Sequence, residues 1–280
     1  MTTPTALTVP TVPTFKTVLC AVDFSSHARA ALYLAAGLTF ARGARLVVLL
    51  VDDRASGDER EQLAARVELD TFVRDTVPGS SSYRESIDLE VLAGPPAETI
   101  LAMAAQVDAE LIVVGTRGRG ALSRALFGST TGELLRTTRV PLAIVPPTHP
   151  ELVSIGETRA APHLGLILVP VDLQRPLSRQ LLFAARLSPG SGHHLLLMHV
   201  AASDVAIAPA SSRLAELARE VPSAKGWRVL AKTGGVNEQV LALVQHESVG
   251  IVVLGQSSVT PGKLAYELLH RGGAVVMVVP

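Results

Sequence analysis

The sequence predicts two tandem α/β domains, each built on an open parallel β-sheet covered by helices. Apolar runs alternate with segments of helical spacing, which is typical of parallel βαβ units with right-handed crossovers. This alternation occurs twice along the 280 residues. The chain is 48% hydrophobic but only 4% aromatic, and Ala, Val and Leu dominate. Such a composition is expected of parallel sheets that pack against small-residue helices.

The first half supplies five strands separated by helices. The expected strands are VLCAVD (18–23), ARLVVLLVDD (44–53), SIDLEVLAG (86–94), ELIVVG (110–115) and VPLAIVP (140–146). The expected helices cover 26–43, 57–77 and 96–108, with a short one over GELLRTT (132–138). Gly43 ends the first helix, Pro78-Gly79 closes the second and Pro96 lies in the first turn of the third, as helix boundaries favour.

The second half repeats this pattern with fewer residues. The offset is 149 at the first two strands, 140 at the third helix and 134 at the last strand. Matching residues are Asp23 and Asp172, Val51 and Val200, Glu98 and Glu238, and Pro146 and Pro280. The second copy is therefore nine residues shorter around its middle helix and six shorter after its fourth strand. The sequence predicts a duplicated domain whose copies differ mainly in one loop.

The repeat sets the expected domain boundaries. We expect a flexible tail at 1–15, the first domain at 16–147, a linker at 148–163 and the second domain at 164–280. The start of the chain is rich in Thr and Pro and lacks the basic segment and apolar core of a secretory signal. No apolar run reaches about 18 residues. We therefore expect no transmembrane helix, and a cytoplasmic protein.

Charge and cysteine content exclude several functions. The 25 basic and 25 acidic residues give a formal net charge of zero, so we expect neither nucleic acid nor a membrane as partner, and any anion site must be local. The single cysteine, Cys20, excludes an internal disulfide framework and a multi-cysteine metal site. His193, His194 and His199 have no Cys or carboxylate at ligand spacing, so we expect no metal site built by the protein itself.

One loop combines the features that hold phosphate. The stretch GTRGRGALSRALFGSTTGELL (115–135) follows an apolar strand and is rich in glycine, arginine and hydroxyl side chains. Glycines let backbone N–H groups approach an anion, and a helix N-terminus adds unpaired donors and a positive dipole end. Ser129 or Thr130 is the expected N-cap of the following helix. Arg117 and Arg119 add local positive charge.

Two common nucleotide motifs do not fit this loop. A P-loop requires Gly-Lys followed by Ser or Thr, and Gly262-Lys263 is followed by leucine. A dinucleotide fingerprint needs a third glycine after Gly118 and Gly120, and it belongs after the first strand. In an open parallel sheet, ligands bind beyond the strand ends where the strand order reverses. The ends of the first and fourth strands flank that point, so we expect Asp23 to lie near 115–129.

The glycine spacing carries a family resemblance. Gly115, Gly118, Gly128 and Ser129 form the pattern Gly-x-x-Gly-(nine residues)-Gly-Ser, which resembles the ATP-binding signature of universal stress proteins. The strand-end aspartate, the segment GPPAETIL and the closing VPLAIVP extend the resemblance over nearly the whole chain as a tandem pair. It implies a Rossmann-like fold, similar to adenine nucleotide hydrolases, with five parallel strands in the order 3-2-1-4-5. It also implies that the closing strands of the two domains pair within one chain, and it leaves a homodimer open.

The resemblance further implies a ligand and its binding residues. ATP is the implied ligand, with Mg²⁺ or Mn²⁺ as its companion, and no catalytic residue is implied. The adenine and ribose end of the site would be lined by Ala21, Val22, Asp23 and Val51. The phosphate end would be formed by Gly115, Thr116, Arg117, Gly118, Arg119, Gly128, Ser129 and Thr130.

The second copy departs from the signature. After Gly255, Ser258 stands where the second glycine would be, and no Gly-Ser pair follows. With six residues fewer, there is too little backbone to surround a triphosphate. Asp172 and Val200 persist, which leaves a weaker adenosine-like pocket open. We expect a structural or regulatory domain.

The loop and the aspartates also have simpler interpretations. The 115–130 loop could be a flexible connection, and Asp23 could cap the following helix as well as contact a ligand. Asp52, Asp53 and Asp58 form a charged loop in which nothing specific poises a carboxylate for acid–base chemistry.

These observations favour a nucleotide-binding module for stress response or signalling. Occupancy by ATP would change its shape, oligomerisation or partner affinity, and hydrolysis would at most be slow. One alternative is an ATP-hydrolysing or nucleotidyl-transfer enzyme of related α/β fold. Another is a ligand-free dimerisation scaffold in which both sites are vestigial.

Overall fold

The computed structural model describes residues 15–117, 128–149, 151–157, 159–174, 178–187, 194–221, 227–255 and 261–280. The strands of the first half are β1 (Thr17–Val22), β2 (Arg45–Val51), β3 (Ile87–Leu92), β4 (Leu111–Gly115) and β5 (Leu142–Val145). Its helices are α1 (Ser26–Phe40), α2 (Glu59–Thr76), α3 (Pro96–Gln106) and α4 (Ser129–Thr137), with short helical segments η1 (Asp53–Ser56) and η2 (Ser80–Ser86).

The second half repeats these elements after a small hairpin of β6 (Val153–Ile155) and β7 (Ala160–Pro162). Its strands are β8 (Leu166–Pro170), β9 (His194–Ala201), β10 (Trp227–Thr233), β11 (Val249–Gly255) and β12 (Val275–Val279). Its helices are α5 (Ser178–Leu187), α6 (Ile207–Glu220), α7 (Val236–His246) and α8 (Pro261–Glu267), with the short segments η3 (Asp204–Ala206) and η4 (Leu268–Gly272).

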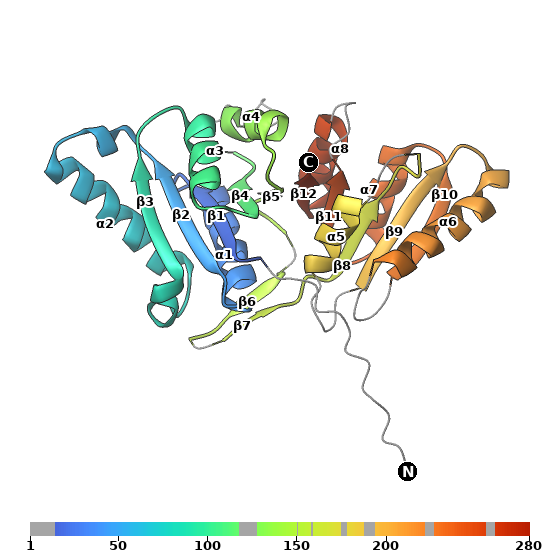
Figure 1. Ribbon diagram of the computed structural model, residues 1–280, viewed down its shortest axis with the longest axis horizontal. Helices are drawn as coiled ribbons and strands as arrows, with labels where there is room; N and C mark the ends of the chain where they lie inside the picture. The colour runs from blue at the N-terminus through green and yellow to red at the C-terminus, as the bar shows by residue number, and fades with distance from the viewer. Residues whose placement is uncertain are drawn as a thin grey trace, which may run out of the picture.

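The two halves share one ten-stranded sheet in the order β10-β9-β8-β11-β12-β5-β4-β1-β2-β3 (Figure 1). Within each half the order is 3-2-1-4-5 and all neighbours are parallel. The predicted fold class is therefore confirmed. At the centre of the sheet, β5 and β12 pair antiparallel, with Ala143 opposite Met277. The strands of the two halves consequently run in opposite directions.

Local sequence signals set the starts of the first three helices. Ser25 caps α1 by accepting a hydrogen bond from the Ala28 N–H group. Asp58 and Glu61 form a capping box at the start of α2, which satisfies two unpaired N–H groups at once. Pro96 occupies the first turn of α3, where its missing N–H costs nothing.

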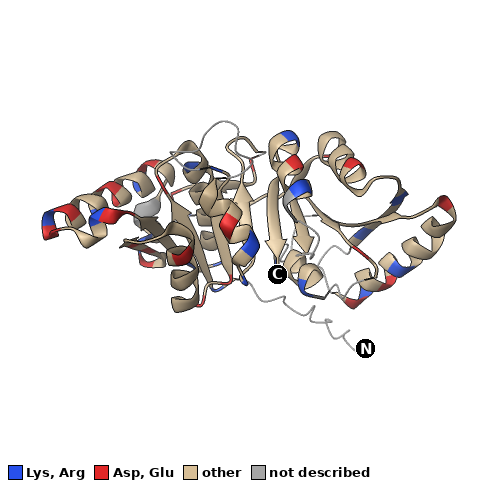
Figure 2. Cartoon of the chain, turned by 90° about the horizontal axis from the view of Figure 1, so that it is seen from above, with Lys and Arg blue, Asp and Glu red and all other residues tan. Residues whose placement is uncertain are grey.

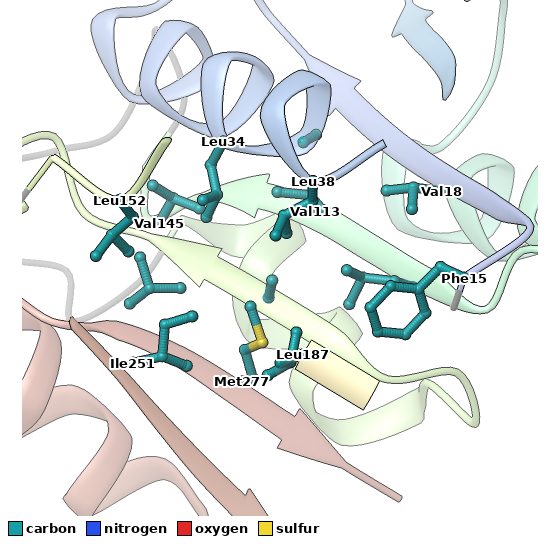
Figure 3. Packing of buried hydrophobic residues seen from close by; sticks show 14 of the residues in the cluster. Phe15, Val18, Leu34, Leu38, Val113, Val145, Leu152, Leu187, Ile251 and Met277 are labelled. Atoms are coloured by element: carbon teal, nitrogen blue, oxygen red, sulfur yellow. The ribbon is translucent and has the colours of Figure 1, made fainter. Parts of the chain in front are cut away.

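A helical layer covers each face of the sheet, with a buried apolar cluster beneath it. The first cluster contains residues of α1, α2, α5 and α6, and the second contains residues of α3, α4, α7 and α8. The first cluster crosses from one half to the other, since Val145, Ile251 and Met277 all belong to it (Figure 3). Burial of this continuous apolar surface is the main force that joins the halves.

The segment expected to be a linker folds in part against the first half. The hairpin of β6 and β7 lies within 148–163, and Leu152 and Val153 are buried. A Cβ atom at Gly37 of α1 would lie 2.5 Å from the Val153 Cβ atom. The absence of a side chain at Gly37 therefore lets the hairpin pack directly on α1.

Phe15, the last residue of the expected tail, is buried. Its ring centroid lies 5.5 Å from that of Phe183 in α5, and the Arg186 guanidinium carbon lies 4.5 Å from the Phe15 ring centroid. Arg186 also donates to Glu110 Oε1 at 2.7 Å. These contacts tie the start of the first half to the second. Within the described ranges, no helix is long and apolar enough to cross a membrane.

Candidate functional site

A pocket lies where the strand order of the first half reverses. The chain builds β1, β2 and β3 outward and then returns to the other side of β1 with β4, so the carboxyl ends of β1 and β4 are neighbours. The pocket has a volume of about 370 Å³. It is lined by Ala21, Val22, Asp23, Ala28, Val51, Pro96, Ile100, Val114, Gly115, Arg117, Gly128, Ser129, Thr130 and Thr131.

Nine of the twelve predicted binding residues are among these lining residues. Thr116 is buried beside the pocket, while Gly118 and Arg119 lie outside the described residues. The prediction missed Ala28, Val114 and Thr131, and it did not assign a role to Pro96 or Ile100. The motif GPPAETIL contains both of the latter, so the signal for the α3 side of the pocket was present in the sequence.

The strand-end aspartate is held in place by the turn that follows β1. Ser25 donates to Asp23 Oδ1 from its backbone N–H at 3.2 Å and from its hydroxyl at 2.6 Å. Between them, Phe24 adopts a left-handed conformation with φ of 63°. The N-cap of α1 is Ser25 and not Asp23. The carboxylate is therefore oriented at the pocket wall by a turn and not by capping the helix.

Gly115 lets β4 end against the first turn of α1. A Cβ atom at this position would lie 2.8 Å from both the carbonyl carbon and the Cβ atom of His27. No real side chain tolerates such contacts, so any substitution must move α1 or the strand end. The Gly115 carbonyl also accepts a hydrogen bond from the Thr131 hydroxyl at 3.0 Å. This bond fixes the start of α4 to the end of β4.

The two ends of the glycine-rich loop are joined by a hydrogen bond. Gly128 N–H donates to the Thr116 carbonyl at 3.2 Å. The two described ends of the loop, at Arg117 and Gly128, therefore lie together at the pocket. This brings the end of β4 and the start of α4 to one place, where a helix N-terminus can hold a phosphate.

The N-terminus of α4 faces the pocket. The helix begins at Ser129, and its N-cap is Gly128, which makes no side-chain capping bond. The expectation that Ser129 or Thr130 is the N-cap was wrong, because the helix starts earlier than the hydroxyl pattern suggested. Both hydroxyls instead line the pocket within the first helical turn. Together with Arg117, this helix end offers an anion positive potential and N–H donors.

His27 and Thr116 are joined behind the pocket. The His27 Nδ1 atom lies 2.6 Å from the Thr116 Oγ1 atom. Burial lowers the pKa of His27 below its usual value, the nearby positive charge of Arg117 lowers it further, and Asp23 acts in the opposite direction. The imidazole is therefore biased toward its neutral form at the start of the loop.

The other end of the pocket is apolar. Ala21 and Val51 come from the ends of β1 and β2, and Pro96 and Ile100 come from the first turns of α3. Gly94, with φ of 130°, makes the turn that brings Pro96 there. The pocket thus joins an apolar end to a positively polarised helix end. Such an arrangement fits a flat ring attached to an anionic group.

The matching region of the second half is built differently. Asp172 keeps the same turn, since Gln174 N–H donates to its Oδ1 atom at 3.0 Å. Gln180 of α5 donates from Nε2 to the carbonyls of Pro170 at 2.9 Å and Val253 at 2.8 Å. The ends of β8 and β11 are therefore bridged by a buried side chain at the position that matches Ala31 of α1.

Two further expectations concern Ser258 of the second copy and a metal site built by the protein. Ser258 falls in 256–260, which the structure does not describe. Among the residues that are described, no group of three or more His, Cys, Asp or Glu could hold a metal ion.

Comparison with known proteins identifies relatives of the first half. The family model described as "Universal stress protein family" matches residues 14–146. A universal stress protein of Thermus aquaticus is 35% identical over 136 residues, which are 47% of this chain and 98% of that protein. A universal stress protein of Mycobacterium tuberculosis strain H37Rv is 32% identical over 87 residues, which are 31% of this chain and 26% of that longer protein.

A solved structure matches the tandem arrangement as a whole. The crystal structure of a universal stress protein from Archaeoglobus fulgidus DSM 4304 superposes with a TM-score of 0.70. The match covers 94% of this chain and 98% of that chain at 18% identity. At this identity, the likeness establishes a shared fold across both halves.

Proposed function

Because this chain belongs to the universal stress protein family, we propose that its first half binds one molecule of ATP in the pocket between β1, β4, α3 and α4. The observation that carries this proposal is that one pocket has an apolar end, beside Ala21 and Val51, and a polarised helix end at Ser129. The faces of an adenine ring are flat and apolar, whereas a triphosphate is an anion. The two ends of the pocket match the two ends of the nucleotide.

The size and position of the pocket support this ligand. Small-molecule pockets usually measure about 300–1,000 Å³ and lie at the switch points of parallel sheets. The described pocket, at about 370 Å³, holds the ring and ribose beside Ala21 and Val51. The phosphates lie toward Gly128 and Ser129, next to the residues of the glycine-rich loop.

A divalent metal would enter this site with the phosphates. Mg²⁺ keeps several waters and binds through phosphate oxygens with only one or two protein oxygens. The Asp23 carboxylate and the Ser129 hydroxyl line the pocket and supply donors of that type. The residues present therefore fit Mg²⁺ or Mn²⁺ held mainly by ATP, whose negative charge the ion would partly neutralise.

We propose a binding module and not an efficient enzyme. The Asp23 carboxylate is held by Ser25, and His27 contacts Thr116. The contact between Thr116 and His27 pairs a hydroxyl with a base, but Thr116 is buried, so its hydroxyl is not open to a bound phosphate. ATP occupancy would instead change the shape of the first half, its oligomerisation or its affinity for a partner. A cytoplasmic location and a role in stress response or signalling remain predictions of the same hypothesis.

Calorimetric titration of the full chain with Mg-ATP tests this function. We expect one site per chain, and we expect Gly128→Glu to weaken binding at least about tenfold, because its carboxylate would repel the phosphates. Gly128 has a φ of −59°, so its backbone accommodates a side chain. A chain with no ATP affinity, or with two equal sites, would contradict the proposal.

A matched pair of variants separates the two halves. Asp23→Ala and Asp172→Ala remove the same carboxylate from the same type of turn. We expect only Asp23→Ala to weaken ATP binding. Equal losses would place the site elsewhere. Phosphate release measured on the same samples tests the enzymatic alternative, which turnover well above slow background, lost in Asp23→Ala, would support.

A further inference from the structure

The ten-stranded sheet ends in two strands that pair on one side only. In the described chain, β3 pairs with β2 and β10 pairs with β9, and these strands lie at opposite ends of the sheet (Figure 1). No side chain of β3 or β10 is fully buried, whereas those of β4, β5 and β11 are almost all buried. The outer N–H and C=O groups of such edge strands can pair with a further strand.

The two edges carry opposite charges on the same face of the sheet. Asp88 and Glu90 alternate with the apolar residues of β3, whereas Arg228 and Lys232 alternate with those of β10. Figure 2 shows the distribution of acidic and basic residues over the chain. Both pairs share the face of the second apolar cluster, to which Leu92 and Leu230 belong. On this face, the side chains of β3 are therefore acidic and those of β10 basic.

Existing ion pairs neutralise only part of these charges. Asp88 pairs with Arg45 of β2, and Arg228 lies 3.9 Å from Glu247. Neither Glu90 nor Lys232 has an ion-pair partner in the described parts of the chain. Both are partly buried, so an opposite charge brought beside either of them would be poorly screened.

The opposite face of each edge carries apolar side chains. Next to β3, a groove of about 290 Å³ is lined by Val73, Ile87 and Leu89 together with the charged residues Arg66, Asp70, Arg74, Arg84 and Asp88. Asp70 forms ion pairs with Arg74 and Arg84. Leu63 and Val67 of α2 line this groove and are 62% and 56% exposed. On β10, the residues of the corresponding face include Trp227 and Val229, and Val229 is 37% exposed.

The strand directions allow the two edges to meet. Because β5 and β12 are antiparallel, β3 and β10 run in opposite directions. If a second copy is shifted across the strands of the sheet without rotation, its β10 lies antiparallel to β3 of the first copy. Each face of the sheet then continues on the same side in both copies. Contact between two β3 edges would place acidic residues opposite each other, and contact between two β10 edges would place basic residues opposite each other. Like charges at such positions destabilise the pairing of two strands.

We propose that the chain assembles head to tail, with β3 of one copy pairing with β10 of the next. The acidic and basic residues then meet on one face, and Val229 enters the groove beside Leu63 and Val67 on the other. Such a contact joins two different surfaces and does not close. It therefore predicts a series of multimers that extends beyond the dimer.

Zero-length cross-linking with a carbodiimide tests the contact directly, because this reagent joins carboxylates to lysine amines. Within one chain, β3 and β10 are separated by nine strand spacings, or about 43 Å at about 4.8 Å each. A cross-link from Asp88 or Glu90 to Lys232 must therefore join two chains. We expect this cross-link in mass spectra, together with sedimenting species above 29.4 kDa that fade in high salt.

Charge reversal provides the decisive comparison. Glu90→Lys and Lys232→Glu should each abolish the multimers, whereas an equimolar mixture of the two variants should reassemble, because each mutated edge then meets an opposite charge. Glu151→Lys, in the exposed loop before β6, is the control and should leave assembly unchanged. Thermal unfolding of each variant verifies that it is folded. A single 29.4 kDa species at all concentrations, or no reassembly of the mixture, would overturn the proposal.

Discussion

The Nδ1 atom of His27 lies 2.6 Å from the Oγ1 atom of Thr116, although the two residues are 89 positions apart in the chain. The contact joins the first turn of α1 to the residue that follows β4. The same two segments meet at Gly115, which leaves no room for a side chain beside His27. The start of the glycine-rich loop is therefore fixed by α1 as well as by its own strand.

The first prediction concerns the pH dependence of this contact. The pKa of His27 is lowered in the folded chain, so the unfolded chain binds more protons near the usual pKa of about 6.5. His27 thus lowers the free energy of unfolding as the pH falls below about 6.5 and has no effect well above it. His27→Gln should remove this part of the acid sensitivity. Thermal unfolding of both proteins between about pH 5 and 8 measures the difference.

Nucleotide binding should act on the same imidazole. Phosphate charge near Arg117 favours the protonated form of His27, so ATP should raise its pKa and bind more tightly as the pH falls through that range. NMR titration of the His27 ring with and without Mg-ATP reports both values. If the pKa is unchanged by ATP, the phosphates do not lie beside this loop.

The second prediction compares glycines at matching positions of the two copies. Gly115→Ala places a Cβ atom 2.8 Å from the His27 carbonyl carbon, which is backbone, whereas Gly255→Ala places one 3.0 Å from the Oε1 atom of the Gln180 side chain. We expect Gly115→Ala to cost about 1–3 kcal/mol of unfolding free energy and to weaken ATP binding. Gly255→Ala should cost less and leave ATP affinity unchanged. Chemical denaturation and calorimetry test both variants, and equal effects would contradict this account.

Much of the fold could be predicted because its signals are local and repeated. The apolar runs ending at Asp23 and Asp172 recur at a fixed offset, and parallel strands of this kind allow few arrangements. The pocket residues were implied by the family resemblance, which rests on the strand-end aspartate and the glycine spacing. The apolar runs and the glycine spacing are each contained in a short stretch of sequence, so they can be recognised without knowledge of distant contacts.

The parts that escaped prediction depend on contacts distant in the sequence. The hairpin strands β6 and β7 have only three residues each, too few for a periodic pattern, and Val153 is buried only because Gly37 receives it. In the sequence, His27 is an isolated histidine, and only the fold shows that the end of β4 places Thr116 beside it. Gln180 likewise reads as one polar position in a helix, although it bridges two strands.

The third prediction concerns that bridge. Gln180→Leu keeps the apolar stem of the side chain but removes the donor that serves the Pro170 and Val253 carbonyls. Loss of a buried donor should lower the free energy of unfolding by about 1–3 kcal/mol. ATP affinity should not change, because the pocket lies in the other half. Gln245→Leu on the exposed side of α7 is the control for the change of residue type. A rise in the number of ATP sites would instead show that Gln180 blocks a second pocket.

The last prediction uses Cys20 as an internal reporter of ATP binding. Cys20 lies in β1 next to Ala21, is fully buried, and has its thiol pKa raised by burial. Since the thiolate is the reactive species, thiol reagents should label Cys20 only when the chain opens. A ligand at 100 times its Kd stabilises the folded chain by about 2.7 kcal/mol. Where opening is a rapid equilibrium, this should slow labelling about 100-fold.

The Gly128→Glu variant separates this effect from general stabilisation of the fold. Its labelling rate without ATP should match that of the unmodified chain, because Gly128 lies at the pocket surface and not in the core. Addition of ATP should then give little protection, since the added carboxylate opposes the phosphates. Rapid labelling of the unliganded chain in native buffer would contradict the burial of Cys20. Equal protection by ATP in both proteins would place the nucleotide outside the pocket between β1 and β4.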